Sequence, residues 1–301
     1  MLAKRDLGSR VVVRRRVGSR FTDLLGELTE LSETHLTVAT IRGKIRVPLD
    51  EVHRSKRVPD PAGLERAAAE AMPAPTVKRL GEWQLRAAEG FTGRANSVLP
   101  LGDPGLPFAE AMDEVIDFYQ SQGLPPQVDV PLPLGRPVAR ALESLGWVPM
   151  VTVLVQVIDL PELIAATPPG SAFIIAAEPS EQMLSMIKGR RGGLPASAAH
   201  VLTAVPSVAF AGYQEKDVLL AMARGTVTRR WLGLTFVETA PEGRRRGLAR
   251  EAIGAIARWA EPEGATRAFL QVQDDNSAAL ALYDSLGFQA HHRYTRYTRF
   301  G

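Results

Sequence analysis

The sequence predicts a mixed α/β protein, in which a large sheet is flanked by helices and is preceded by a small all-β module. Three observations support this fold class. Residues 9–58 read as short strands separated by turn residues, two later regions alternate strands with helices, and each of those regions ends a helix on Leu-Gly followed by an aromatic residue. The length of 301 residues is enough for two or three domains.

Composition excludes several classes of function. The chain is 45% hydrophobic and 23% charged, as is usual for a soluble globular protein, and no apolar run approaches the roughly 20 residues of a membrane span. There is no cysteine, and the five histidines are not in ligand spacing, so we expect neither a disulfide nor a metal site. We therefore expect a cytoplasmic protein with no membrane partner.

The basic residues give only a weak indication of nucleic-acid binding. The net charge is +3, and the arginines are spread over several segments. Clusters stand at residues 14–16 and 244–246, and a solvated charged face is the simpler interpretation of the first. The sequence thus argues against nucleic acid as a partner.

Residues 1–60 are predicted to form a small SH3-like β-barrel. Strands are expected at 10–16, 22–30, 35–40 and 43–48, with about five short strands in all. Such modules bind peptides or nucleic acid in some proteins and only pack in others. Phe21 is the single aromatic residue in this module, so the sequence offers no aromatic platform for a ligand.

Two proline-rich stretches predict the remaining boundaries. Residues 61–76 combine prolines with a short helical stretch at 63–71 and are expected to be a linker. A second seam at 160–170 contains three prolines. The chain is thereby divided into the barrel, a middle unit at 77–160 and a last domain at 171–301.

The middle unit and the last domain share an order of elements. In the middle unit we expect strands at 83–88, 95–99, 127–130 and 148–158 and helices at 108–122 and 137–145. In the last domain we expect helices at 248–260 and 277–286, each followed by a strand, at 267–272 and 290–299. Because residues 141–147 also match 282–288 in pattern, we infer a weak internal repeat of one α/β unit.

The strongest chemical indication is the turn at residues 240–249. A strand of β-branched and aromatic residues runs into a Pro/Gly turn, three arginines and an alanine-rich helix. The first N–H groups of a helix are unpaired and carry partial positive charge, so this turn suits an anion such as a pyrophosphate. Gly247 and Ala249 would leave room for it. The alternative is an ordinary strand-to-helix connection with exposed arginines.

This turn resembles the signature of the GNAT acetyltransferases, Arg/Gln-x-x-Gly-x-Gly/Ala, because residues 244–249 read Arg-Arg-Arg-Gly-Leu-Ala. A second family pattern, Asn-x-x-Ala-x-x-x-Tyr-x-x-x-Gly-Phe, matches residues 276–288 at every specified position. The resemblance covers residues 171–301, extends to the middle unit only in element order, and does not include the first 60 residues. It implies a tandem, pseudo-duplicated GNAT fold with a degenerate middle copy.

The resemblance also implies a role for each matched residue, with acetyl-CoA as the cosubstrate. The backbone of Val237 and Thr239 would bind the acetyl carbonyl and the pantetheine arm, Asn276 would contact the pantetheine region, and Tyr283 would protonate the departing thiolate. From the residues alone, Asn276 is as well explained by capping a helix, and Tyr283 by packing in the core. The pyrophosphate would be held by the turn: Arg244, Arg245, Arg246, Gly247, Leu248 and Ala249.

The general base is not identified by the sequence. Many family members carry a glutamate four residues before the position of Val237, but here that position is Gly233. Glu238 is close in sequence, although strand alternation turns it to the face opposite Val237, and we keep it only as a candidate for substrate contact. Asp274, Asp275, a water chain or a residue of the middle unit are the other possibilities.

The middle unit is predicted not to bind CoA and to shape the acceptor pocket instead. Its equivalent turn, residues 101–107, has no arginine, places Asp103 where an anion would bind, and contains prolines that lack an N–H. The stretch 90–97 is rich in polar donors at a strand edge. Arg94, Asn96 and Ser97 are therefore our candidates for contact with the acceptor.

Taken together, the residues and the resemblance predict an N-acetyltransferase that moves an acetyl group from acetyl-CoA to a primary amine of a small molecule or peptide. The alternative is a non-catalytic acetyl-CoA sensor whose basic N-terminal barrel contacts a partner or nucleic acid. The missing strand glutamate favours this alternative. The sequence does not identify the acceptor.

Overall fold

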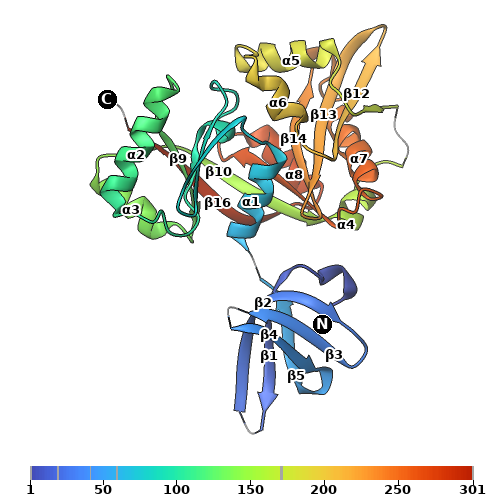
Figure 1. Cartoon of the computed structure of the whole chain (residues 1–301). Coiled ribbons are helices and arrows are strands. Elements are labelled where there is room, and N and C mark those ends of the chain that lie inside the picture. The colour runs from blue at the N-terminus through green and yellow to red at the C-terminus, as the bar shows by residue number, and fades with distance from the viewer. Residues whose placement is uncertain (1, 19, 41, 59, 170–171, 300–301) are drawn as a thin grey trace. The chain divides into compact units, whose positions relative to one another are not determined.

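Two separate sheets organise the chain (Figure 1). The computed structural model describes residues 2–18, 20–40, 42–58, 60–169 and 172–299. They fall into two units, Met1–Asp60 and Pro61–Gly301. In the described ranges, no helix has both the length and the apolar character needed to cross a bilayer.

The N-terminal unit is a five-stranded antiparallel sheet with strand order β4-β3-β2-β1-β5. The four strands expected by residue range are present, and the SH3-like class remains a prediction. Short 3-10 turns at Lys4–Asp6 and Leu49–Glu51 complete the unit. The strands are β1 (Arg10–Val17), β2 (Arg20–Leu31), β3 (His35–Thr40), β4 (Gly43–Pro48) and β5 (Val52–Arg57). Its core consists of aliphatic side chains with 0–1% exposure: Val11, Val13, Leu28, Leu36, Val38 and Val47.

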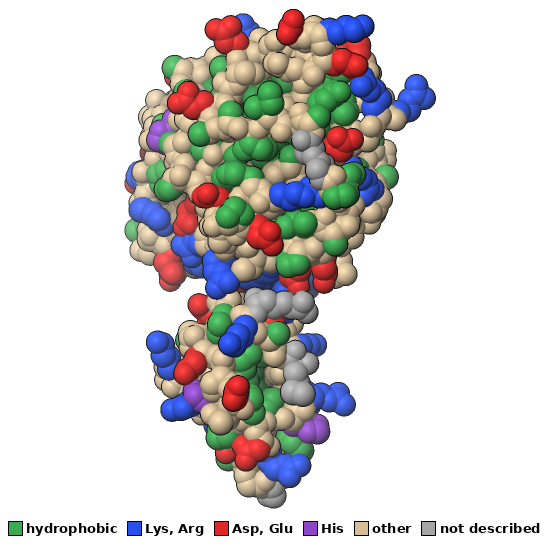
Figure 2. Space-filling view, turned by 90° about the vertical axis from the view of Figure 1, so that its right-hand side faces the viewer, with side chains coloured by type: hydrophobic (Ala, Val, Ile, Leu, Met, Phe, Trp, Pro, Cys, Tyr) green, Lys and Arg blue, Asp and Glu red, His purple; other side chains and the backbone are tan. Residues whose placement is uncertain are grey.

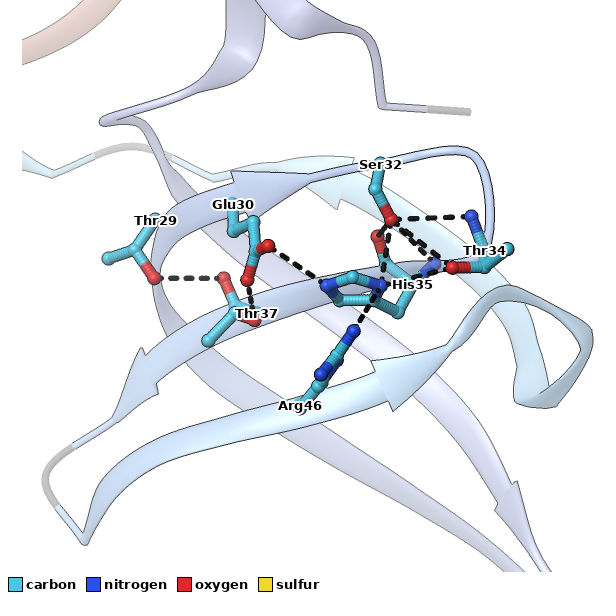
Figure 3. Close-up of polar contacts among 7 residues, drawn as sticks. All are labelled: Thr29, Glu30, Ser32, Thr34, His35, Thr37 and Arg46. Atoms are coloured by element: carbon cyan, nitrogen blue, oxygen red, sulfur yellow. Dashed lines mark hydrogen bonds and ion pairs between the residues drawn. The ribbon is translucent and has the colours of Figure 1, made fainter.

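A polar network joins β2, β3 and β4 (Figure 3). Arg46 donates an N–H to Nδ1 of His35 (2.9 Å), and the Ser32 hydroxyl lies 2.7 Å from the same nitrogen. Because Nδ1 accepts, the ring carries its proton on Nε2, which lies 3.0 Å from Oε1 of Glu30. Hydrogen bonds from Thr37 and His35 lower the pKa of Glu30. The network therefore explains the buried His35 as a structural residue.

The second unit is built on an eleven-stranded sheet with order β11-β12-β13-β14-β15-β10-β16-β9-β8-β7-β6. Its strands are β6 (Thr76–Leu80), β7 (Trp83–Ala87), β8 (Val98–Leu99), β9 (Gln127–Leu132), β10 (Val148–Asp159), β11 (Ile174–Ala176), β12 (Val208–Glu215), β13 (Val218–Thr228), β14 (Trp231–Thr239), β15 (Arg267–Gln273) and β16 (Gln289–Thr298).

The strand order shows how two related halves share this sheet. In the middle half β8 is parallel to β9, and in the last half β14 is parallel to β15. The final strand of each half crosses to the other: β10 pairs with β15, β16 pairs with β9, and β10 and β16 pair with each other at the centre. The two halves thus belong to one unit, whereas a boundary between two domains was expected at 160–170. The corresponding helices are α2 (Phe108–Ser121), α3 (Arg136–Ser144), α7 (Leu248–Ala260) and α8 (Ser277–Ser285).

Helix α1 (Pro61–Ala71) corrects the linker expected at 61–76. Leu64 and three alanines of this helix are buried against Trp231 of β14 and Phe269 of β15. Their small side chains let the helix approach the sheet closely, which stabilises both through apolar burial. A Pro/Ala-rich composition that is typical of a linker therefore belongs here to a core helix.

Three further helices lie where the sequence analysis located none. Helix α4 (Leu160–Ala165) follows β10 directly and buries Leu160 and Leu163, so the first part of the expected seam contributes side chains to the core. Helices α5 (Glu181–Arg191) and α6 (Ser197–Thr203) pack in one cluster with Phe91 of the middle half and Phe236 of β14. In Figure 1 these two helices lie beside β12 to β14.

Candidate active site

Strands β14 and β15 pair over only three residues and then separate. Residues 231–233 lie opposite 267–269, and no later pair joins the two strands within the described residues. Strand β14 also carries a bulge, because its register with β13 shifts between Met222 and Arg224 and Phe236 has a φ of 49°. The separation leaves Val237 and Thr239 on a strand that diverges from its neighbour.

The structure gives a steric reason for the glycine at position 233. A Cβ at Gly233 would lie 2.8 Å from the Phe269 ring and 3.1 Å from Oγ1 of Thr226. A glutamate at this position would displace the ring that packs against α1. Position 233 therefore has no room for the glutamate of the family pattern.

The diverging strands border a cavity of about 370 Å³. It is lined by parts of β14, β15, α1 and α8, by the loop at 92–94 and by Arg190 of α5. Of the predicted site residues, Val237, Glu238, Asn276, Tyr283 and Arg94 line this cavity, whereas Thr239, the turn 244–249, Asn96 and Ser97 do not.

The turn before α7 has the geometry of an open helix N-terminus. Gly247 is the N-cap residue with a φ of 80°, and among the described residues no side chain caps the first N–H groups of α7. A Cβ at Gly247 would have only a Glu251 oxygen nearby, at 3.9 Å, so the space beside it is open. Arg246 is exposed and pairs with Glu215 (2.8 Å), while the Leu248 side chain is buried in the core, so only its backbone faces this space.

Asn276 and Tyr283 hold two positions on α8 that face the cavity. Oδ1 of Asn276 accepts a hydrogen bond from the Ala279 amide (3.2 Å), so this residue caps the helix as well as lining the cavity. The Tyr283 ring meets the Phe288 ring edge-on at 5.9 Å. Burial, followed by the charge of Glu238, raises the pKa of Tyr283 to about 12. The phenol therefore keeps its proton at neutral pH.

Glu238 is closer to the predicted acid than strand alternation suggested. Val237 and Glu238, which are adjacent in β14, both line the cavity, and β14 carries a bulge beside them. Its carboxylate lies 3.4 Å from Nε of Arg190 and is 16% exposed. Glu238, Arg190 and Tyr283 thus line the same cavity, from three different elements.

Of the three candidate residues in the loop at 90–97, one lines the cavity and two have structural roles. Arg94 is 9% exposed, lines the cavity, and has its guanidinium carbon 5.0 Å from the centre of the Tyr294 ring. Asn96 instead accepts the amides of Ala88 (2.7 Å) and Gly90 and shapes the loop from within. Ser97 is fully buried and donates to Asp129 (2.8 Å). The expectation that Asn96 and Ser97 contact the acceptor is not supported, because their polar atoms are used inside the loop.

Comparison with known proteins now identifies the family. A family model described as probable histone acetyltransferase Rv0428c C-terminal matches residues 61–298. The chain belongs to this family of GNAT acetyltransferases. It is thus an acyltransferase, and acetyl transfer is the reaction of the family to which it belongs.

Two relatives cover most of this acetyltransferase. The uncharacterized N-acetyltransferase YobR of Bacillus subtilis is 30% identical, covering 77% of this chain and 96% of its own. The probable histone acetyltransferase Rv0428c of Mycobacterium tuberculosis is 31% identical, covering 97% and 95%. A GCN5-related N-acetyltransferase from Kribbella flavida shares the fold, with a TM-score of 0.62 and 17% identity over 80% of this chain and 96% of that one.

The middle half of this acetyltransferase has a turn of different character. In the turn at 101–107, the Asp103 amide donates to a carboxylate oxygen of Glu82 (2.8 Å), and Asp103 in turn accepts the Gly105 amide (2.7 Å). Pro107, which has no N–H, is the N-cap of α2. Carboxylates of the protein itself thus occupy two amides of the turn before α2.

Sequence reasoning missed Arg190, Arg296 and Thr92, which all line the cavity of the acetyltransferase. Thr92 stands two residues before Arg94 in the loop at 90–97, which supplied three other candidates. Arg190 belongs to α5, a helix that the sequence pattern did not predict. Arg296 was hidden for another reason, because β16 crosses into the other half of the sheet and only this pairing brings it to the site.

Proposed function

We propose that this chain transfers the acetyl group of acetyl-CoA to a primary amine of a small molecule or peptide by direct attack. The observation that carries the proposal is the cavity between the diverging strands β14 and β15. Tyr283 and Glu238 both line it, at the end of the strand that leads into α7. A proton donor and a proton acceptor are therefore available to the same bound amine and thioester.

The described residues fit acetyl-CoA at two points. The N-terminus of α7 has no side-chain cap in the part of the chain that the structure describes, and the space beside Gly247 is open, which suits a pyrophosphate. Strand β14 beyond Gly233 does not pair with β15, which leaves room for a pantetheine arm along Val237 and Thr239. When bound, acetyl-CoA would supply an acetyl group activated as a thioester.

In this proposal three groups of the protein stabilise charge or transfer protons. The Val237 amide donates to the acetyl oxygen as negative charge develops on it. Glu238, directly or through one water, accepts the proton that the attacking nitrogen loses as the C–N bond forms. Tyr283 donates its proton to the sulfur as the C–S bond breaks, and the proton held by Glu238 restores the phenol. The sum is one amide and one CoA thiol, with no net change in the protein.

Binding of acetyl-CoA at α7 can be tested by thermal shift. Acetyl-CoA should raise the melting temperature of the parent protein, because a ligand selective for the folded state stabilises it. Gly247→Glu should lose this shift, since it places a side chain and a like charge at the open N-terminus. Gly247→Ala, which shares the strained backbone but not the charge, is the matched control and should keep most of the shift. An unchanged shift in Gly247→Glu would place acetyl-CoA elsewhere.

The transfer reaction is tested by measuring CoA thiol release with a panel of amines. Amine-dependent release, with an acetylated product of matching mass, would support the proposal. Tight binding of acetyl-CoA without release for any amine would overturn it and support the sensor. The panel should include small amines and lysine peptides, since the relatives include a probable histone acetyltransferase.

A further inference from the structure

Arg94 is a buried cation without a full set of partners. Its Nη2 atom is shielded from solvent and has no hydrogen-bond partner among the described residues, although the side chain lines the cavity. Oγ1 of Thr92, in the same loop, is also buried and unpartnered there. The ring of Tyr294 offers Arg94 a cation–π contact, which replaces only part of the lost hydration. An unpaired buried guanidinium is costly, so its retention at a cavity wall requires an explanation.

The two carboxylates near Arg94, those of Asp129 and Glu65, are hydrogen-bonded to other groups in the described structure, although Asp129 does act on Arg94 through its charge. Three buried or half-buried guanidiniums meet here, those of Arg86, Arg94 and Arg296. Asp129 is taken by Arg296, which donates two hydrogen bonds to it (2.7 and 2.8 Å), and by the Ser97 hydroxyl. The other nearby carboxylate, Glu65, lies 3.0 Å from Nε2 of His292 and accepts from Gln271. The cluster therefore has spare positive charge where it borders the cavity.

The loop at 90–97 holds the guanidinium of Arg94 at the wall of the cavity. Asn96 donates to the Thr92 carbonyl (2.6 Å) and accepts two amides of the preceding turn, which fixes the residues on either side of Arg94. Gly93 has no room for a side chain, because a Cβ there would overlap Nη1 of Arg296. The arginines are thus packed closely by a rigid loop instead of dispersing toward solvent.

We propose that the acceptor of this enzyme is an amine that also carries a carboxylate, and that Arg94 and the Thr92 hydroxyl bind the carboxylate. The inference rests on the proposed acetyl transfer. A carboxylate offers planar oxygens that match a guanidinium fork, and it would bring the missing negative charge into the cavity. Glu238 then faces the amino end of the same molecule. A lysine-rich basic peptide, by contrast, would bring more positive charge to a wall that already has an excess.

The test compares matched acceptors. An ω-amino carboxylate series of increasing length, the corresponding primary carboxamides, and an ω-amino phosphonate should be assayed for CoA release. The parent enzyme should prefer the best carboxylate over its carboxamide by on the order of 10²-fold in kcat/KM, since a buried charge pair is broken by the amide. If the enzyme prefers the phosphonate, the anion that it recognises is not a carboxylate, and the proposed class of acceptor is wrong.

Variants assign the preference to Arg94. Arg94→Gln should reduce the preference to a few-fold or less while leaving the KM for acetyl-CoA unchanged, Arg94→Lys should keep part of it, and Thr92→Val should weaken it even if Arg94→Gln folds poorly. Arg79→Gln, at an exposed arginine on β6 outside the cavity lining, is the matched control and should keep it. A preference that survives Arg94→Gln, or equal use of carboxylate and carboxamide by the parent, would refute the inference while leaving acetyl transfer intact.

Calorimetry separates failure of this inference from failure of the proposed function. If no amine releases CoA but an ω-amino carboxylate still binds in an Arg94-dependent manner, acetyl transfer fails and the anion site stands. If amines release CoA without any Arg94-dependent binding of carboxylates, the reverse holds.

Discussion

Glu238 and Tyr283 line one cavity from β14 and α8, and the carboxylate is the second cause, after burial, of the raised pKa of the phenol, which reaches about 12. A protonated phenol beside a carboxylate is an arrangement that suits proton transfer. The phenol is held protonated, because burial and a neighbouring negative charge both disfavour its anion. The carboxylate itself lies 3.4 Å from Nε of Arg190.

Replacing Tyr283 by phenylalanine should lower turnover by roughly 10²–10⁴-fold with little change in acetyl-CoA affinity. The change keeps the ring, its packing against Phe288 and the helix, and removes only the hydroxyl. Steady-state kinetics together with calorimetry for acetyl-CoA would check this. An unchanged turnover, under conditions where chemistry limits the rate, would reduce Tyr283 to a packing residue.

The same substitution should change stability at alkaline pH. The folded-state pKa of Tyr283, about 12, lies above the reference value of 10.0. The contribution is therefore complete below pH 10 and is lost as pH rises through 12, because the unfolded chain releases the proton first. Between pH 9 and pH 11 the parent should lose about 1 kcal/mol more than Tyr283→Phe in urea unfolding. Parallel curves for the two proteins would contradict the raised pKa.

Glu238→Gln should reduce kcat by about 10²-fold or more if this carboxylate takes the proton of the amine. The variant keeps the shape of the side chain, so acetyl-CoA affinity should hardly change. Arg190→Gln removes only its ion-pair partner and should have a smaller effect. A rate profile for Glu238→Gln that equals the parent at every pH would exclude Glu238 as the base and direct attention to Asp274 or Asp275.

Local signals in the sequence predicted the elements best. Helix α7 was expected at 248–260 and α8 at 277–286, and the structure has Leu248–Ala260 and Ser277–Ser285. The spacing of apolar residues and the glycine that ends a helix both lie within one segment, so they predict the helix without knowledge of the fold. The pairing of β10 with β15 and of β16 with β9 could not be read in this way, because strand exchange depends on contacts between distant segments.

The candidate site shows the same limit. The turn at 244–249 and the helix around Tyr283 carry motifs in continuous sequence and could be recognised. In the loop at 90–97 the sequence does not distinguish the three candidates for acceptor contact, and only the fold separates Arg94 at the cavity from Asn96, which bonds within the loop. Strand alternation argues against Glu238 as the base, because it assigns Glu238 and Val237 to opposite faces, and only the fold shows that both residues line the cavity.

Arg224 should be among the most costly single positions for stability. It is fully buried, and it donates to the carbonyls of Ala71 (3.1 Å) and Leu202 (2.8 Å), at the ends of α1 and α6. Arg224→Met would leave these carbonyls unpaired in the core and should destabilise the protein by about 3 kcal/mol or more. Arg229→Met, which breaks the exposed pair with Glu70 (2.7 Å), should cost at most about 1 kcal/mol. Equal unfolding midpoints for the two variants would contradict this assignment.

A single acetyl-CoA should bind per chain, although the sheet contains two related halves. Calorimetry counts the sites directly. Among the described residues, neither α7 nor α2 has a side-chain cap, so the difference lies in the turn before each helix. In the middle half the Glu82 carboxylate accepts the Asp103 amide, Asp103 accepts the Gly105 amide, and Pro107 has no N–H. A pyrophosphate there would meet two carboxylates, whereas the turn before α7 carries arginines. Glu82→Gln removes one of these charges but keeps an acceptor oxygen for the Asp103 amide, so it should not create a second site. A stoichiometry of two in the parent protein would show that the middle half still binds CoA.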